Sequence, residues 1–181
     1  VTRSTTYSDT TPHTITHDLN VISQPAYDVE NRVLEQRDAR GSVTRFVYDA
    51  AGRPVRTIVN YVDQGGTDPG DWVYEDGVWK RGAGSAAVDH GPHSDQNLVS
   101  ETVYDLSGRV LESRDAQGSL TRYVYDGLGR RLLTIANYVP QGTPEAWVYV
   151  GGVWKESPGG PAVVQRSDPA REHYDQNLIS Q

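Results

Sequence analysis

Histidine and aspartate come together at three points of the sequence, and this pairing could support metal or proton chemistry. The three pairs are His17/Asp18, His93/Asp95 and His173/Asp175. A histidine beside a carboxylate can ligate zinc or relay a proton. The spacing within the pair changes from one point to the next, whereas a metal site needs fixed geometry. We therefore favour a hydrogen-bonded joint over a metal site.

Three acidic residues, Asp63, Asp68 and Asp71, resemble part of a calcium-binding loop. The matching segment 140–145 keeps only one acid, so the feature is not a repeated one. The chain has no Cys, which removes thiolate zinc sites, disulfides and thiol nucleophiles. Phosphate-binding loops and nucleophile elbows are also missing. The sequence predicts no catalytic residue, no metal and no cofactor, and we expect a protein that is not an enzyme.

Aromatic residues form the strongest candidate for binding. They lie in two predicted hairpins, at Trp72, Tyr74, Trp79, Trp147, Tyr149 and Trp154. The turns Asp76-Gly77 and Gly151-Gly152 predict type I′ geometry, in which both residues have positive φ. Counted from the turn, each tyrosine then faces the second tryptophan of its hairpin. These aromatic platforms could stack on sugar rings, or could be buried against a neighbouring repeat or subunit, and we favour burial.

The elements that position these residues are repeated. The segment 18–62 returns at 95–139, and a third copy opens at 175–181. We expect a tail of a preceding repeat at 1–17, a first repeat at 18–94, a second at 95–174 and the start of another at 175–181. The repeats are about 77–80 residues long. Such tandem copies predict a window on a longer array.

Each repeat is punctuated by Asp-x-x-Gly turns, such as Asp49–Gly52 and Asp126–Gly129. Aspartate accepts backbone N–H bonds across such a turn and glycine takes the left-handed position, a role that Asn31 can fill. The turns predict an all-β fold of antiparallel hairpins in meander order. The strands are expected at 32–37, 42–48, 53–62, 109–114, 119–125 and 130–139, with loops at 81–94 and 156–174.

Composition limits the remaining function classes. The net charge of −7 argues against nucleic-acid binding, which needs clustered Lys and Arg. No stretch approaches 18 consecutive apolar residues, so no membrane span is expected. Only 36% of the residues are hydrophobic, which argues against one thick core.

The segments 41–53 and 118–130 resemble the YD repeat of Rhs and teneurin-like proteins. The motif residues are Tyr48, Asp49, Gly52, Arg53, Tyr125, Asp126, Gly129 and Arg130. The resemblance implies β-hairpin arrays that coil into a sheet-walled shell or spiral in secreted or surface-exposed proteins. Family members enclose a toxin, serve in adhesion or build surface structures.

The tryptophan hairpins and the loops at 63–94 and 140–174 make each unit longer than the short family repeat. We expect a structural segment of a filament, fibre or shell wall, located outside the cell or on its surface. Its partners would be neighbouring repeats or identical subunits. The alternative is a carbohydrate-binding adhesive module that uses the aromatic platforms, with glycans as its partners.

Overall fold

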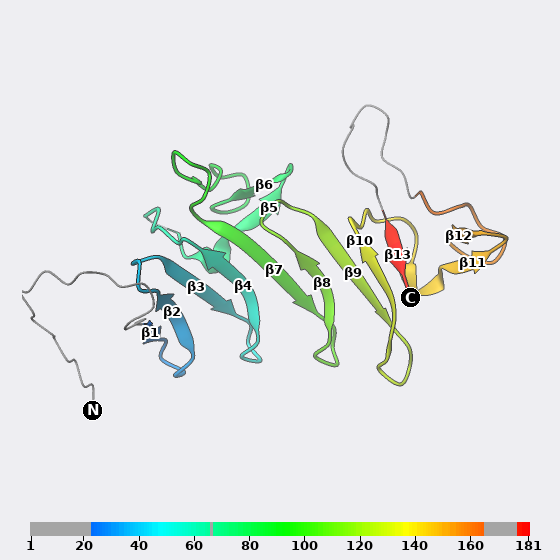
Figure 1. Cartoon of the computed structure of the whole chain (residues 1–181), viewed down its shortest axis with the longest axis horizontal. Coiled ribbons are helices and arrows are strands. Elements are labelled where there is room, and N and C mark those ends of the chain that lie inside the picture. The colour runs from blue at the N-terminus through cyan, green and yellow to red at the C-terminus, as the bar shows by residue number, and fades with distance from the viewer. Residues whose placement is uncertain (1–22, 66, 165–176) are drawn as a thin grey trace, which may run out of the picture.

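A computed structural model of the chain describes residues 23–65, 67–164 and 177–181. The described part is built of 13 strands and two 3-10 turns, with no α-helix. Nine strands form one antiparallel sheet in the order β1-β2-β3-β4-β7-β8-β9-β10-β13 (Figure 1). Their bounds are Gln24–Tyr27, Val33–Arg37, Val43–Tyr48, Pro54–Val59, Leu98–Tyr104, Val110–Arg114, Leu120–Tyr125, Arg131–Ala136 and Leu178–Ser180. The predicted all-β meander is confirmed.

Two small hairpins stand apart from the large sheet. The first pairs β5 (Val73–Glu75) with β6 (Val78–Lys80), and the second pairs β11 (Val148–Val150) with β12 (Val153–Lys155). Each follows a 3-10 turn, at Pro69–Asp71 and at Pro144–Ala146. Asp76 (φ 54) and Gly77 (φ 82) both have positive φ, as the predicted type I′ turn requires.

The strands follow the aspartate and glycine turns. In the turn between β3 and β4, the Asp49 carboxylate accepts hydrogen bonds from the amides of Ala51 and Arg53, and Gly52 has φ 78. At the corresponding position of the first such turn, Asn31 takes φ 62. Aspartate and a left-handed residue therefore fix each turn in the way that the sequence predicts.

The prediction that strands continue through 53–62 and 130–139 is wrong at their ends. β4 stops at Val59 and β10 at Ala136. The next residues, Asn60 (φ 53) and Asn137 (φ 50), are left-handed, and this conformation turns the chain out of the sheet. The chain then continues into the long loop that carries the hairpin.

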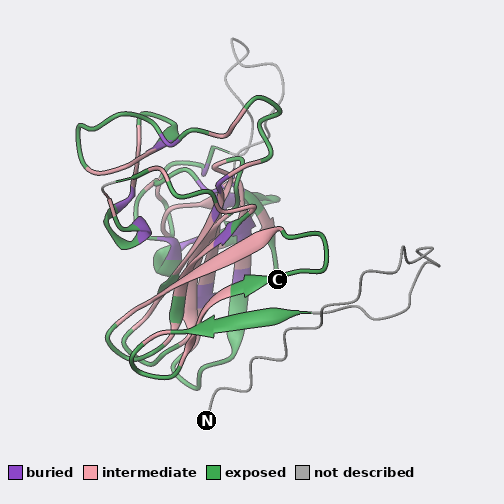
Figure 2. Ribbon diagram, turned by 90° about the vertical axis from the view of Figure 1, so that its left-hand side faces the viewer, coloured by how far each residue is buried: buried purple, intermediate pink, exposed green. Residues whose placement is uncertain are grey.

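The apolar core lies between the large sheet and the two small hairpins. Figure 2 shows the buried residues where the loops cover one face of the sheet. One core cluster contains Ile58, Trp72, Trp79, Val88 and Val99, and the other contains Val124, Leu133, Ile135, Tyr138, Trp147, Trp154 and Val163. The core is thus divided into two small clusters, and Val99 of the second repeat completes the cluster of the first hairpin.

Some of the sequence-based predictions concern residues that the structure does not describe. The predicted tail at 1–17 and the residues His17 and His173 lie outside the described residues. The proposed repeat boundaries stay a prediction. No helix in the described ranges is long and apolar enough to cross a membrane.

Candidate repeat interface

The Tyr-Asp-x-x-Gly-Arg motif is held together by its aspartate. In the first repeat, Arg53 donates to the Asp49 carboxylate through its side-chain Nε at 2.7 Å and through its amide at 2.9 Å. Arg130 repeats both contacts with Asp126 at 2.7 and 2.8 Å. The Arg53 side chain and then the amides hold the pKa of Asp49 below its ordinary value. The motif is therefore a turn clamped by a charged hydrogen bond.

Arg53, and Arg109 of the Asp105–Arg109 turn, also reach the next tyrosine along the sheet. The Arg53 guanidinium lies 4.5 Å from the ring centre of Tyr104, and Arg109 lies 4.5 Å from that of Tyr125. The Tyr104 phenol donates to the Pro54 carbonyl at 3.1 Å. Because Arg53 belongs to the first repeat and Tyr104 to the second, this cation–π contact ties one repeat to the next.

The motif glycine lies beside this contact. A Cβ at Gly108 would lie 3.6 Å from Nη1 of Arg53, which is an ordinary van der Waals distance. The arginine of one unit thus lies over the turn of the next. The preference for glycine comes from the φ of +81° at Gly108.

A buried asparagine joins the two repeats at the other end of the strands. Asn97 is fully buried, and its φ is 51. Its side-chain Oδ1 accepts from the Val62 amide at 3.0 Å, and its Nδ2 donates to the Asp89 carbonyl at 2.9 Å. Its amide donates to the Asn60 carbonyl at 3.0 Å. One side chain therefore fastens the long loop of the first repeat to the first strand of the second.

The joint recurs with the same chemistry. Asn177 is also fully buried, and it bonds the Val139 amide at 3.0 Å and the Val164 carbonyl at 2.9 Å. Gln64 supports the first joint by bonding both backbone groups of Asp89, and Gln141 does the same at Val164. The expected hydrogen-bonded joint exists, but asparagine and glutamine form most of it.

Histidine has a smaller part in the joint than the sequence suggests. His90 Nδ1 lies 3.0 Å from the Gln96 carbonyl oxygen. Among the described residues, no group of three His, Asp or Glu side chains gathers in a way that could hold a metal. Asp63 and Asp68 instead accept amide hydrogen bonds from Gly65 and Gly70 within their own loop.

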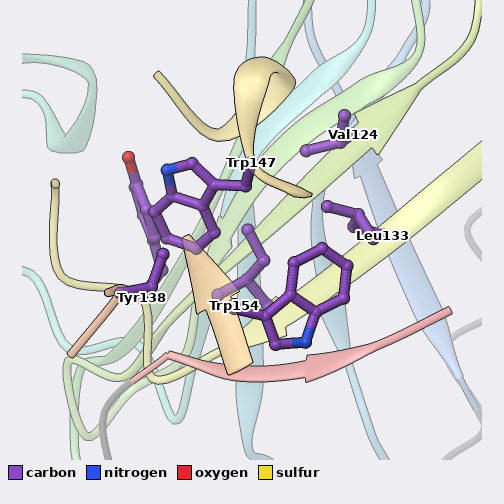
Figure 3. Close-up of a cluster of buried hydrophobic side chains, with 7 residues drawn as sticks. Val124, Leu133, Tyr138, Trp147 and Trp154 are labelled. Carbon is purple, nitrogen blue, oxygen red and sulfur yellow. The ribbon is translucent and has the colours of Figure 1, made fainter. Parts of the chain in front are cut away.

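The tryptophans of both hairpins face inward. Trp72, Trp79, Trp147 and Trp154 are 1%, 2%, 5% and 8% exposed. The predicted facing pairs are present, with Tyr74 opposite Trp79 and Tyr149 opposite Trp154. Figure 3 shows Trp147 beside Tyr138, and Trp154 beside Leu133. These four rings lie inside the fold and offer no exposed row for a ligand to stack on.

The two tyrosines of the hairpins differ in their surroundings. Tyr74 packs under the guanidinium of Arg114, which lies 4.2 Å from its ring centre. A Cβ at Gly118 would overlap the Tyr74 phenol. Both Arg114 and Gly118 belong to the second repeat, so this tyrosine is a contact between repeats. Tyr149, at the same place in the second hairpin, is 60% exposed.

The space beneath the hairpins also differs. In the first repeat, Arg56 fills it: the guanidinium lies 5.4 Å from the Trp79 ring centre and 3.2 Å from the Glu101 carboxylate. It also donates to the Pro69 and Gly70 carbonyls. The equivalent residues at the second hairpin are Leu133 and, from the segment that opens the following repeat, Gln181. There a cavity of about 650 Å³ opens, lined by Leu133, Glu145, Trp147, Tyr149, Trp154 and Gln181 among others.

Sequence reasoning identified the turn motif and the aromatic residues but missed the contacts of Asn97, Gln64 and Arg56. A signal for the first two was present, because Asn97 and Gln64 recur at the matching positions Asn177 and Gln141. No such signal marks Arg56, since the second repeat has leucine there. Only the folded arrangement shows that Arg56 and Glu101 are partners.

Comparisons with known proteins found a repeat family and several solved structures. Residues 27–63 and 104–143 match the RHS Repeat family. The solved structure of TcdB2-TccC3-Cdc42 is 17% identical with a TM-score of 0.41, and the match covers 66% of this chain and 4% of that one. The Photorhabdus luminescens Tc holotoxin pore with mutated TccC3 is 19% identical with a TM-score of 0.26, covering 63% and 5%.

The chain thus spans only about one twentieth of the chains in these solved structures. No curated protein sequence matches it. Both family matches begin at the tyrosine of a Tyr-Asp pair, Tyr27 and Tyr104, and both include an Asp-x-x-Gly-Arg turn clamped by its own aspartate. These two segments of the chain therefore match the Rhs, or YD-repeat, family, as the motif residues predict.

Proposed function

We propose that the chain is a non-catalytic wall segment of a secreted or surface-exposed Rhs-repeat protein. The observation that supports this most is the interface between the two repeats. Tyr74 of the first hairpin lies against Arg114 and Gly118 of the second repeat. A repeat whose own hairpin packs on its neighbour is suited to continuous sheet-walled arrays, in which stability comes from neighbour contacts.

Continuity of the sheet supports the same role. β4 of the first repeat pairs with β7 of the second through four residue pairs, from Arg56↔Glu101 to Val59↔Leu98. The backbone hydrogen bonds therefore cross the repeat boundary without a break. This construction fits a stiff wall better than a set of domains on flexible linkers.

Small-angle X-ray scattering of the chain tests the wall role. We expect a profile that fits one rigid, elongated sheet, because sheet and joints are continuous across the boundary. A profile that requires two compact bodies in variable orientation would overturn the proposal.

Protease added to intact cells tests the location, since repeats outside the cell would be cleaved and repeats inside would be spared.

Glycan binding has weaker support as an alternative. The four tryptophan rings are buried, whereas stacking on a sugar needs an accessible ring face. The half-buried Tyr74 is covered by Arg114. A glycan array would promote this alternative only if binding disappeared in Tyr149→Ala while folding was kept.

A further inference from the structure

The sequence contains two Asp-Gly pairs, Asp76-Gly77 at the tip of the β5–β6 hairpin and Asp126-Gly127 in the turn between β9 and β10. An aspartate before glycine can react with its own chain, because a residue without a side chain leaves its amide nitrogen accessible. The two pairs have opposite surroundings. We propose that Asp76-Gly77 is a modification site, at which the aspartate isomerises spontaneously to isoaspartate through a cyclic imide. This inference does not depend on the proposed function.

The reaction needs water and no other co-reactant. The Gly77 amide nitrogen attacks Cγ of the protonated Asp76 carboxyl group, so that an N–Cγ bond forms and the carboxyl hydroxyl leaves with the amide proton as water. Water then adds to one of the two carbonyl carbons of the imide and breaks its bond to nitrogen. Addition at Cγ restores aspartate, whereas addition at the main-chain carbonyl gives isoaspartate. The product therefore has the mass of the starting chain, and no electrons are transferred.

The Asp76 carboxylate can turn toward the glycine amide. Its side chain is 83% exposed, and it accepts a hydrogen bond from Nζ of Lys80 at 2.6 Å. An ion pair between an exposed carboxylate and a flexible lysine contributes little to stability, so it opens readily. The space beside Gly77 is also open, since a Cβ placed there would meet nothing within 4 Å. The carboxyl group can therefore reach the attacking nitrogen once the turn opens.

The backbone of the hairpin tip favours this opening. Asp76 has φ 54 and Gly77 has φ 82. An L-residue such as aspartate adopts this left-handed conformation at a cost in free energy, which it regains when the turn opens. Three residue pairs connect β5 with β6, so the tip belongs to a short hairpin. Opening of the tip therefore releases strain at Asp76 and breaks few contacts.

The Asp126 carboxylate, in contrast, is held in place by the turn clamp. It accepts hydrogen bonds from the Leu128 amide at 2.9 Å, the Arg130 amide at 2.8 Å and Nε of Arg130 at 2.7 Å. Its side chain is 17% exposed. Cyclisation at Asp126 must first break these three hydrogen bonds. The same dipeptide is therefore protected in the β9–β10 turn and unprotected at the tip of the first hairpin.

Isoaspartate would change the first hairpin and leave the second unchanged. The main chain at residue 76 would run through Cβ and Cγ, which adds one carbon to a two-residue turn that needs two left-handed residues. The register that sets Tyr74 opposite Trp79 begins at this turn. The second hairpin has Gly151-Gly152 at the same place and cannot undergo the reaction. The modification would thus act on the hairpin whose tyrosine contacts the second repeat.

Prolonged incubation of the folded chain at neutral pH, followed by peptide mapping with electron-transfer fragmentation, tests the site. We expect isoaspartate at residue 76 to exceed that at residue 126 by about tenfold or more, since one exposed contact is broken at the first and three hydrogen bonds at the second. The chain unfolded in urea is the control, in which both pairs should react at similar rates. Equal amounts at the two residues of the folded chain would overturn the inference.

Variants of the hairpin separate the reaction from its surroundings. Asp76→Asn should form the same imide faster, with ammonia as the leaving group, whereas Asp76→Gly, which copies the second hairpin, should give no product there. Lys80→Gln removes the hydrogen bond that lowers the pKa of Asp76, so more of the carboxyl group is protonated and isoaspartate should accumulate faster. Circular dichroism verifies that each variant is folded. If folded Asp76→Asn keeps its amide while the unfolded variant loses it, the turn blocks cyclisation and the inference is wrong.

Discussion

The two tryptophan hairpins have the same strands and turns but different neighbours. The first is covered by the following repeat, which places Arg114 over Tyr74. The second has Tyr149 60% exposed and a cavity of about 650 Å³ beside it. The hairpin sequence therefore specifies the local fold, and the following repeat determines whether the tyrosine of the hairpin is covered.

In both repeats an arginine of the sheet pairs with an acidic residue of the loop, but the acid stands at a different position in each repeat. Arg45 pairs with Glu35 at 2.9 Å and lies 3.7 Å from Asp68, which caps the first 3-10 turn. In the second repeat, Arg122 pairs with Glu112 at 2.9 Å and with Glu145 at 2.7 Å. Relative to the 3-10 turn, Glu145 lies two positions later than Asp68, and it still reaches the equivalent arginine. A charge from the loop thus fastens the hairpin to the sheet in both copies.

The largest expected effect comes from removing a buried tryptophan. Trp79→Ala should lower the free energy of unfolding by about 3–5 kcal/mol, and Trp154→Ala by about 2–4 kcal/mol. The difference arises because Trp79 is enclosed, whereas Trp154 lines the cavity. Urea unfolding followed by circular dichroism measures both. Equal losses would show that the following repeat adds nothing to the first hairpin.

The joint gives the next largest effect. Asn97→Ala should cost about 3 kcal/mol, because it strands a buried amide and carbonyl and forces alanine into a left-handed conformation. Asn97→Gly keeps that conformation and should cost about 1 kcal/mol less. If the two variants are equally stable, the left-handed backbone is not the reason for asparagine at this position.

A double-mutant cycle measures the interaction between Arg56 and Glu101, which lie beneath the first hairpin and are replaced beneath the second. Arg56→Leu and Glu101→Gln, which give the first hairpin the residues that lie beneath the second, should each lower the free energy of unfolding by about 1–2 kcal/mol. The double variant should cost about 1 kcal/mol less than their sum, because the pair is only 15% and 25% exposed. Strictly additive losses would contradict a direct partnership. The reverse pair, Leu133→Arg with Gln181→Glu, should stabilise the second repeat by filling its cavity.

Acid should weaken the turn clamps. The Arg53 side chain lowers the pKa of Asp49 from its ordinary 3.8, and the Arg130 amide lowers that of Asp126. A lowered pKa in the folded chain means that the stabilisation is present above about pH 4 and is lost as the pH falls through the folded pKa. Urea midpoints measured on acidification should therefore fall.

The comparison of the repeats separates these two clamps. Asp49→Asn should reduce the acid sensitivity more than Asp126→Asn, because Arg53 also stacks on Tyr104 and couples the clamp to the next repeat. An unchanged urea midpoint on acidification of the wild-type chain would contradict the role of both aspartates.

Much of the fold could be predicted because the residues of each turn are sufficient to specify its conformation. Asp49 and Gly52 specify one turn by local hydrogen bonds and a left-handed φ, and the repeats show the pattern again. The sequence does not predict the ends of β4 and β10 because apolar residues resume directly after Asn60 and Asn137, so the pattern gives no sign of their left-handed φ.

The contacts between distant segments could not be predicted. Arg56 and Glu101 are 45 positions apart, and their pairing depends on the register of β4 with β7. The sequence favours burial of the tryptophans, but the surface that covers them depends on how the hairpin folds back over the sheet. Alternation assigns a residue to a face, but it does not show what will cover that face.

Native-state hydrogen exchange of the chain, at a concentration where it is monomeric, tests most directly whether the next repeat completes each hairpin. The amides of β5 and β6 should exchange more slowly than those of β11 and β12, since only the first hairpin is covered by a following repeat within the described residues. Equal protection of the two hairpins, or slower exchange in the second, would contradict the account.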